Sequence, residues 1–215
     1  MIKQTTINMG TKFKDKKRVK TYTMTTAGSS NISITKRDGR KESLDVNKIH
    51  FVVEEACENL PGVSASQIEM NANIQFYDGM TTKDIQNVLV RSANDLISLE
   101  TPNYQYAAAR LLLYDVRKEA HGQYEYMPLS KLIERNCELG VYDKDIMEKY
   151  SKTESKKLNS WIRRDRDLNF TYAGIRQVVD KYLVQDRSTG QLYETPQDMY
   201  TVSYTHLTLP TIYSV

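Results

Sequence analysis

The sequence predicts a mainly α-helical protein that carries small β-hairpins. Apolar residues recur at intervals of three and four over several long segments, which is the spacing of helices that bury one face. The Asp38-Gly39 pair predicts a tight turn, and the alternation of apolar and polar residues around it predicts a β-hairpin over 32–44. A second hairpin is predicted over 183–197, with residues 188–190 at its turn.

Helix start and stop signals divide the helical part into segments. Asp45 suits the N-cap of a first helix over 46–60, which the following Pro-Gly pair ends. Thr81 and Asp84 have the spacing of a capping box for a helix that runs to residue 98. The next helix restarts after Pro102 and is apolar nearly all round at its centre, so it is expected in the middle of a bundle. Further segments with a helical pattern are 66–77, 128–151 and 153–184.

Composition excludes several classes of protein. The 215 residues are 40% hydrophobic and 27% charged, which is ordinary for a soluble globular protein, and no apolar run approaches the roughly 20 residues of a membrane helix. The first 30 residues lack the apolar region of a signal peptide. The two cysteines, Cys57 and Cys137, form neither a metal-ligand spacing nor a disulfide framework, so we expect a cytoplasmic protein.

The two ends of the chain differ from its centre. A basic run over 12–20 and the small polar residues after it predict a solvated, disordered arm over 1–30. An arm that binds nucleic acid is the alternative, but this one lacks interleaved aromatic residues. The stretch 203–215 shows neither a helical period nor clean alternation, and we expect a non-native tail appended to a truncated sequence.

Five cations surround the bend of the first hairpin. They are Lys36, Arg37, Arg40, Lys41 and Lys48. Cations beside a helix N-terminus suit phosphate groups, and the carboxylate of Glu42 can accept a hydrogen bond from the exocyclic amino group of a base. Together, these cations and the carboxylate of Glu42 favour an adenine nucleotide as the ligand. The simpler interpretation is that charges at an exposed hairpin tip only face solvent, and no Gly-rich phosphate loop supports the nucleotide.

The amino-acid sequences of several of these segments resemble those of a known family. "ITKRDGRKESLDVNKI" and "TPNYQYAAARLLLYDVRK" resemble the ATP-cone, a regulatory nucleotide-binding domain. "RDRDLNFTYAGIRQVVDKYLVQD" and "TGQLYETPQ" resemble the start of the large (alpha) subunit of class I ribonucleotide reductase. The resemblance implies an ATP-cone over 31–122, a β-hairpin with four helices. It also implies that 123–202 is the helical start of the reductase α/β barrel domain.

Within the cone, the resemblance implies a site for ATP as activator or dATP as inhibitor, with Mg²⁺ carried by the nucleotide. Lys36 and Arg37 match the phosphate-binding cations, and 42–48 matches the segment around adenine and ribose. Lys118 closes the site, although a lysine there also complements a helix dipole. The full set of implied residues is Lys36, Arg37, Glu42, Ser43, Leu44, Asp45, Val46, Asn47, Lys48, Ile49, Thr82, Gln86 and Lys118.

Three of these residues have competing interpretations. Thr82 is either a hydroxyl near the nucleotide or only part of a helix cap. Lys48 is either a ligand of the nucleotide or a solvated helix residue. Gln86 stands where relatives often carry a histidine or a carboxylate, so its amide can form hydrogen bonds but brings no charge.

The resemblance also implies the activity of the full-length family, which reduces ribonucleoside diphosphates to deoxyribonucleotides for DNA replication. It implies an alpha–alpha homodimer and a radical-generating beta subunit as partners, with no membrane or nucleic acid. The family's catalytic cysteines lie downstream of this sequence, so Cys57 and Cys137 are interpreted as apolar residues and the chain alone is expected to be inactive, without a catalytic cofactor.

Two rival hypotheses are weaker. A cone-type repressor without enzyme activity needs a zinc ribbon with paired CxxC motifs ahead of the cone, and the sequence has none. A nucleic-acid-binding module would use the basic arm, and its binding would fall steeply with salt. His50 and His121 have no ligand partners at metal spacing and are interpreted as structural or exposed.

Overall fold

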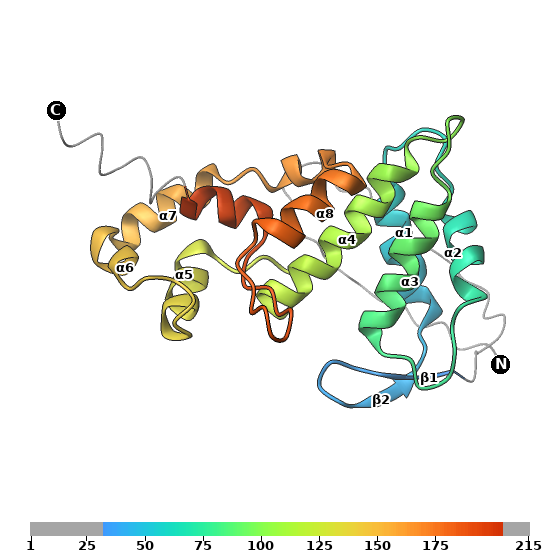
Figure 1. Cartoon of the computed structure of the whole chain (residues 1–215), viewed down its shortest axis with the longest axis horizontal. Coiled ribbons are helices and arrows are strands. Elements are labelled where there is room, and N and C mark those ends of the chain that lie inside the picture. Colours follow the sequence, from blue (N-terminus) through green and yellow to red (C-terminus); the bar gives the residue numbers. More distant parts are fainter. Residues whose placement is uncertain (1–31, 204–215) are drawn as a thin grey trace, which may run out of the picture. The chain divides into compact units, whose positions relative to one another are not determined.

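The computed structural model describes residues 32–203, and the mainly α-helical prediction is confirmed (Figure 1). The predicted arm over 1–30, and the predicted tail from residue 204 on, lie outside the described residues. The elements in chain order are β1 (Ser33–Thr35), β2 (Lys41–Ser43), α1 (Val46–Cys57), α2 (Ala65–Asn73), α3 (Thr82–Asp95), α4 (Tyr104–His121), α5 (Leu129–Glu138), α6 (Asp145–Lys149), α7 (Lys152–Trp161), the 3₁₀ helix η1 (Arg164–Asn169) and α8 (Tyr172–Lys181). Residues 196–203 are also helical.

The first hairpin buries one face of its two strands. β1 and β2 are antiparallel, with Ile34 paired to Glu42 and Thr35 paired to Lys41. Directly opposed residues share a face of the sheet, so Glu42 lies on the same side as the buried Ile34. The turn closes with Gly39 at a φ of 82°, a left-handed conformation that glycine adopts without a steric cost.

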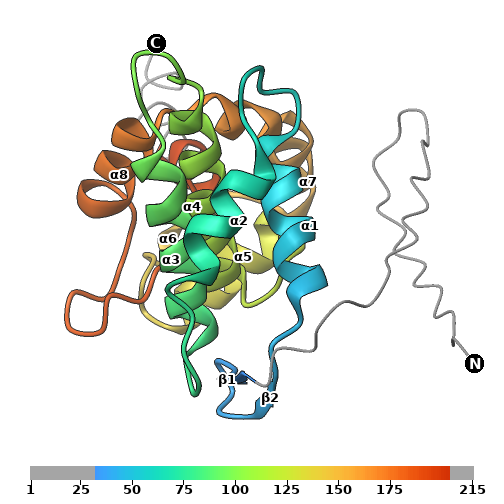
Figure 2. The ribbon, with the colours of Figure 1, turned by 90° about the vertical axis from the view of Figure 1, so that its right-hand side faces the viewer.

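Helices α1 to α4 enclose one apolar core, and Figure 2 shows them side by side above the hairpin. Both predicted caps are confirmed: Asp45 accepts from the Asn47 amide, and Thr81 and Asp84 form a reciprocal capping box. The centre of α4 is buried nearly all round, as its sequence predicts. Helix α2 ends at Asn73, short of the predicted residue 77, because the chain then turns back and bonds to β1 through the Gly79 amide.

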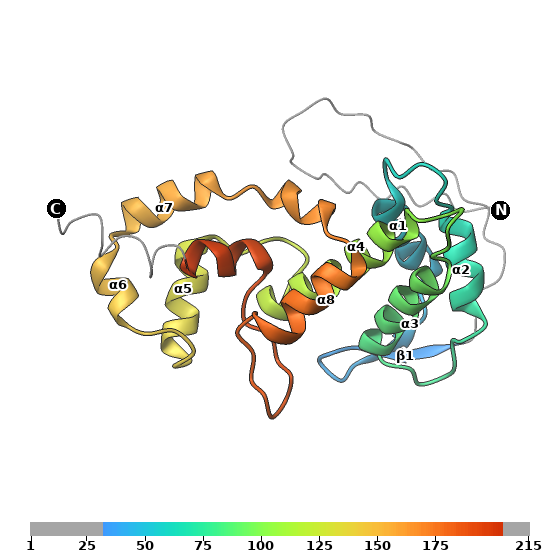
Figure 3. The ribbon, with the colours of Figure 1, turned by 45° about the horizontal axis from the view of Figure 1, so that its top comes forward.

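The remaining helices are shorter than their patterns predict. The 128–151 segment divides into α5 and α6 at Gly140, whose φ of 70° is incompatible with a continuous helix. Helix α8 packs alongside α4 and shares the core of the first four helices (Figure 3), whereas α5, α6 and α7 enclose a second apolar cluster. No helix among residues 32–203 is both long and apolar enough to cross a membrane.

The predicted second hairpin is reduced to one antiparallel bridge between Gln185 and Leu192, without regular strands. Two backbone-to-backbone hydrogen bonds still cross it, and other backbone amides donate to side chains. The Val184 amide donates to the carboxylate of Glu194, and the Leu192 amide donates to the carboxylate of Glu119 in α4. The loop is therefore anchored on α4.

Buried polar side chains join the end of α4 to the segments after it. The carboxylate of Asp198 lies 2.7 Å from Nη2 of Arg164 and 3.1 Å from Nε2 of His121. Thr195 donates to the same carboxylate through its hydroxyl and its amide. His121, interpreted from the sequence as structural or exposed, is buried, and its Nδ1 accepts from the Met127 amide.

Asp167 supports a first testable prediction. Burial raises its pKa to about 6, and its Oδ2 has no hydrogen-bond partner among the described residues. Because the folded pKa exceeds the unfolded value of 3.8, this group's contribution to stability is complete below about pH 4 and is lost as the pH rises through 6. We expect wild-type stability to fall over this range by about 3 kcal/mol relative to Asp167→Asn.

Urea unfolding of both proteins between about pH 4 and 8 measures this difference. Asp165→Asn, at an exposed neighbouring position, is the control and should parallel the wild type above pH 4. Parallel curves for wild type and Asp167→Asn would show that the carboxyl group is ionised throughout.

Candidate nucleotide-binding site

The turn of the first hairpin, the start of α1, the start of α3 and the second half of α4 meet in one place. Thr35 at the end of β1 forms a parallel bridge with Thr81, directly before α3. Arg37 in the turn reaches Asp115 in α4. Figures 1 and 2 show the hairpin beneath the bundle, with its turn directed toward α4. The structure therefore brings together predicted residues from four segments of the sequence.

Glu42 lies between two of the predicted cations. Its carboxylate is 2.7 Å from Nζ of Lys36 and 3.9 Å from Nζ of Lys48, which also lies 3.6 Å from Asp45. The hydrogen bond from Lys36 holds the pKa of Glu42 below its usual value. This arrangement follows from the hairpin register, because Lys36, two residues after Ile34, continues the face that Glu42 occupies.

Arg37 is held by a residue that sequence reasoning missed. Its Nη2 lies 2.5 Å from Oδ1 of Asp115, which is 8% exposed. Burial raises the pKa of Asp115, while the charge of Arg37 acts in the opposite direction. One signal was available, because Asp115 is a carboxylate one turn after Leu111 on the buried side of the most apolar helix.

Lys118 completes the cluster from α4. Its Nζ lies 5.8 Å from the ring centroid of Tyr114, one turn earlier. Partial desolvation lowers the pKa of Lys118, and the nearby charges of Arg37 and Lys36 lower it further. A cation whose pKa is depressed by like charges gains most from an added anion. The site therefore favours a negatively charged ligand.

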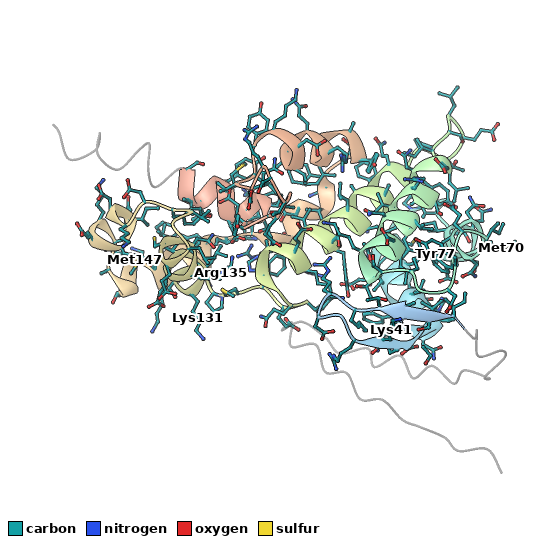
Figure 4. The ribbon with its side chains drawn as sticks, turned by 60° about the horizontal axis from the view of Figure 1, so that its bottom comes forward. Lys41, Met70, Tyr77, Lys131, Arg135 and Met147 are labelled. Atoms are coloured by element: carbon teal, nitrogen blue, oxygen red, sulfur yellow. The ribbon has the colours of Figure 1, made fainter. Side chains whose placement is uncertain are left out.

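Two cations of the bend lie outside this cluster. Arg40 is exposed and pairs with Asp38 at 2.7 Å within the turn. Lys41 pairs with Thr35 on the opposite face of the hairpin from Glu42, and Figure 4 shows it on the outside of the strands. The solvent-facing interpretation thus fits these two residues. By contrast, Lys36 and Lys48 share the carboxylate of Glu42, and Arg37 reaches α4.

The other predicted residues lie in two segments, 43–49 and the start of α3. Thr82 is half-buried as the first residue of α3, next to the bridge to β1. Gln86, one turn on, donates from its amide to the Leu111 carbonyl at 2.8 Å, so it links α3 to α4. In the 43–49 segment, Asp45 caps α1, while Leu44 and Ile49 pack into the core. Ser43, Val46 and Asn47 complete the segment at partly or fully exposed positions.

No metal-binding cluster accompanies these residues. Among residues 32–203, no group of three or more His, Cys, Asp and Glu side chains could hold a metal ion. The carboxylates of Glu42 and Asp115 are each engaged by a cation.

Comparison with known proteins agrees with this geometry. Residues 32–119 match the family described as the ATP cone domain. The chain is 45% identical over 172 residues to ribonucleoside-diphosphate reductase 1 subunit alpha of Salmonella typhimurium, a match over 80% of this chain and 23% of that protein. The protein of the same name from Escherichia coli is 44% identical with the same coverage. The alpha subunit of Enterobacteria phage T4 is 44% identical over 77% of this chain and 22% of its own length.

The hairpin and helices α1 to α4 make up the segment that matches the ATP cone domain. Over the matched segment, the chain is similar to ribonucleoside-diphosphate reductase alpha subunits. It spans less than a quarter of the length of these relatives, 23% of the first two.

Proposed function

We propose that the cluster between the hairpin and α4 binds ATP or dATP as an allosteric effector. The observation that supports this most is a cluster of four cations around two carboxylates. Lys36 and Lys48 lie at Glu42, while Arg37 lies at Asp115, and the charges of these cations act on Lys118. Phosphates would engage the cations, and Glu42 would accept from the adenine amino group. Two internal carboxylates already offset part of the positive charge, so a triphosphate would bind best with Mg²⁺ neutralising some of its own charge.

The effector would control the reduction of ribonucleoside diphosphates to deoxyribonucleotides in the full-length protein. The names of the relatives support this reaction class. ATP and dATP would act through different affinities for two assembly states of the alpha subunits with a beta subunit.

In this chain, burial raises the pKa of the Cys57 thiol to about 11 and also raises that of Cys137. Neither thiol is activated, so we infer that this chain does not itself carry out the reduction.

Titration calorimetry of the full 215-residue chain with MgATP and with MgdATP tests the proposal. Wild type should bind both nucleotides, and Lys36→Ala combined with Lys118→Ala should weaken binding about 100-fold, because two charge-assisted contacts are lost. The matched control is Lys41→Ala combined with Lys131→Ala, which removes the same charge from exposed lysines outside the cluster. Equal losses in both double variants would point to non-specific attraction, and an absence of heat with wild type would overturn the proposal.

A further inference from the structure

Asp115 is a buried acid beneath the proposed phosphate site. Only one atom of Arg37, Nη2, contacts it, although a guanidinium has five N–H donors. The Arg37 side chain remains 37% exposed, whereas that of Asp115 is 11% exposed. The pair is therefore asymmetric, with the carboxylate in the interior and an arginine side chain that is partly open to solvent.

This asymmetry decides whether Arg37 could leave Asp115 when a nucleotide binds. Departure would strand a buried carboxylate without its counterion, which is a strongly unfavourable state. Lys83 in α3 also acts on Asp115, but its Nζ lies 3.3 Å from Glu119. Lys118 carries its own depressed pKa and lies on the same helix face. Retention of the Arg37–Asp115 contact is thus favoured over its replacement.

We propose that Asp115 is a positioning residue for the effector site, which holds the guanidinium of Arg37 so that its remaining donors face the nucleotide phosphates. This inference rests on the proposed function. The contact links the tip of a two-stranded hairpin to the most buried helix of the domain. A guanidinium fixed in this way loses less side-chain freedom when a ligand binds, because that cost has already been met in folding. Asp115 would act without touching the nucleotide.

A double-mutant cycle measured by calorimetry with MgATP tests the role of Asp115. Asp115→Asn keeps the shape of the side chain and should weaken MgATP binding about tenfold, because a neutral amide holds the guanidinium less firmly. Arg37→Ala should weaken binding by at least the same factor. In the double variant, Asp115→Asn should add nothing to the loss caused by Arg37→Ala. Asp115→Glu should recover part of the affinity, because it restores the charge.

Inorganic triphosphate is the second probe. It lacks the base and ribose, so a phosphate-directed effect of Asp115→Asn should weaken its binding by the same factor as that of MgATP. A merely structural role for Asp115 would instead give the same loss with and without Arg37. That result, or unchanged or tighter MgATP binding by Asp115→Asn, would overturn the positioning role and leave the proposed function standing. If wild type fails to bind MgATP, the proposed function itself is wrong.

Discussion

Replacing Asp198 by asparagine is expected to lower the free energy of unfolding by about 3–5 kcal/mol. Asp198 is 0% exposed, and its carboxylate accepts from Arg164 at 2.7 Å and from the Thr195 hydroxyl at 2.5 Å. Removing the negative charge leaves the guanidinium of Arg164, whose side chain is 14% exposed, without a counterion in the interior. Urea denaturation followed by circular dichroism measures the loss.

A matched control comes from the same region of the chain. Asp165 also pairs with an arginine, Arg163 at 3.1 Å, but both side chains are mostly exposed. Asp165→Asn should leave the unfolding midpoint unchanged within error, because exposed ion pairs contribute little to stability. If the two asparagine variants unfold at the same urea concentration, the buried network does not hold the end of α4 to the segments after it.

Acid should weaken the same network in the wild type. Burial alone would raise the pKa of Asp198, but His121 and Arg164 lower it to about 2, below the unfolded value of 3.8. A group with a depressed folded pKa stabilises the protein above its unfolded pKa, and that stabilisation is lost as the pH falls from about 4 to about 2. This is opposite in sign to the effect of Asp167, whose contribution is lost as the pH rises through 6.

The sequence predicted the helices best where local signals and burial agree. The α1 and α3 caps and the apolar centre of α4 were all readable, because each depends on residues within one or two turns. The division of the 128–151 segment and the reduction of the second hairpin to one bridge were not. The first depends on the left-handed backbone of Gly140, and a single glycine within a helical pattern does not by itself specify a break. The second depends on distant partners, such as the carboxylate of Glu119 for the Leu192 amide.

The candidate site could also be predicted only in part from the sequence. The cations of the bend were visible in the sequence, but the hairpin register had to be known before Lys36 could be separated from Lys41. Asp115 lies 78 residues from Arg37, and no local pattern connects them. Lys118 was assigned through family resemblance, and the mutual effects of the cluster on its pKa became visible only in three dimensions.

Leu111→Ala is expected to lower the free energy of unfolding by about 2–5 kcal/mol. Leu111 is 0% exposed at the centre of α4, so truncation removes buried apolar surface and leaves a cavity that the surrounding helices only partly fill. Leu99→Ala is the control, because Leu99 lies in the connection between α3 and α4 and is fully exposed. It should unfold at the wild-type urea concentration, whereas an equally mild effect at Leu111 would mean that α4 is not the centre of the core.

The same variant tests whether core and site fold as one unit. Leu111 precedes Asp115 and Lys118 by one and two turns of α4, and its carbonyl accepts from Gln86. A ligand that binds only the folded state stabilises it by about 2.7 kcal/mol at a concentration 100 times its Kd. MgATP at that excess should therefore raise the unfolding free energy of wild type and of Leu111→Ala by the same amount, with a single transition in each case. A separate transition would show that the proposed effector site unfolds independently of α4, which carries Asp115 and Lys118.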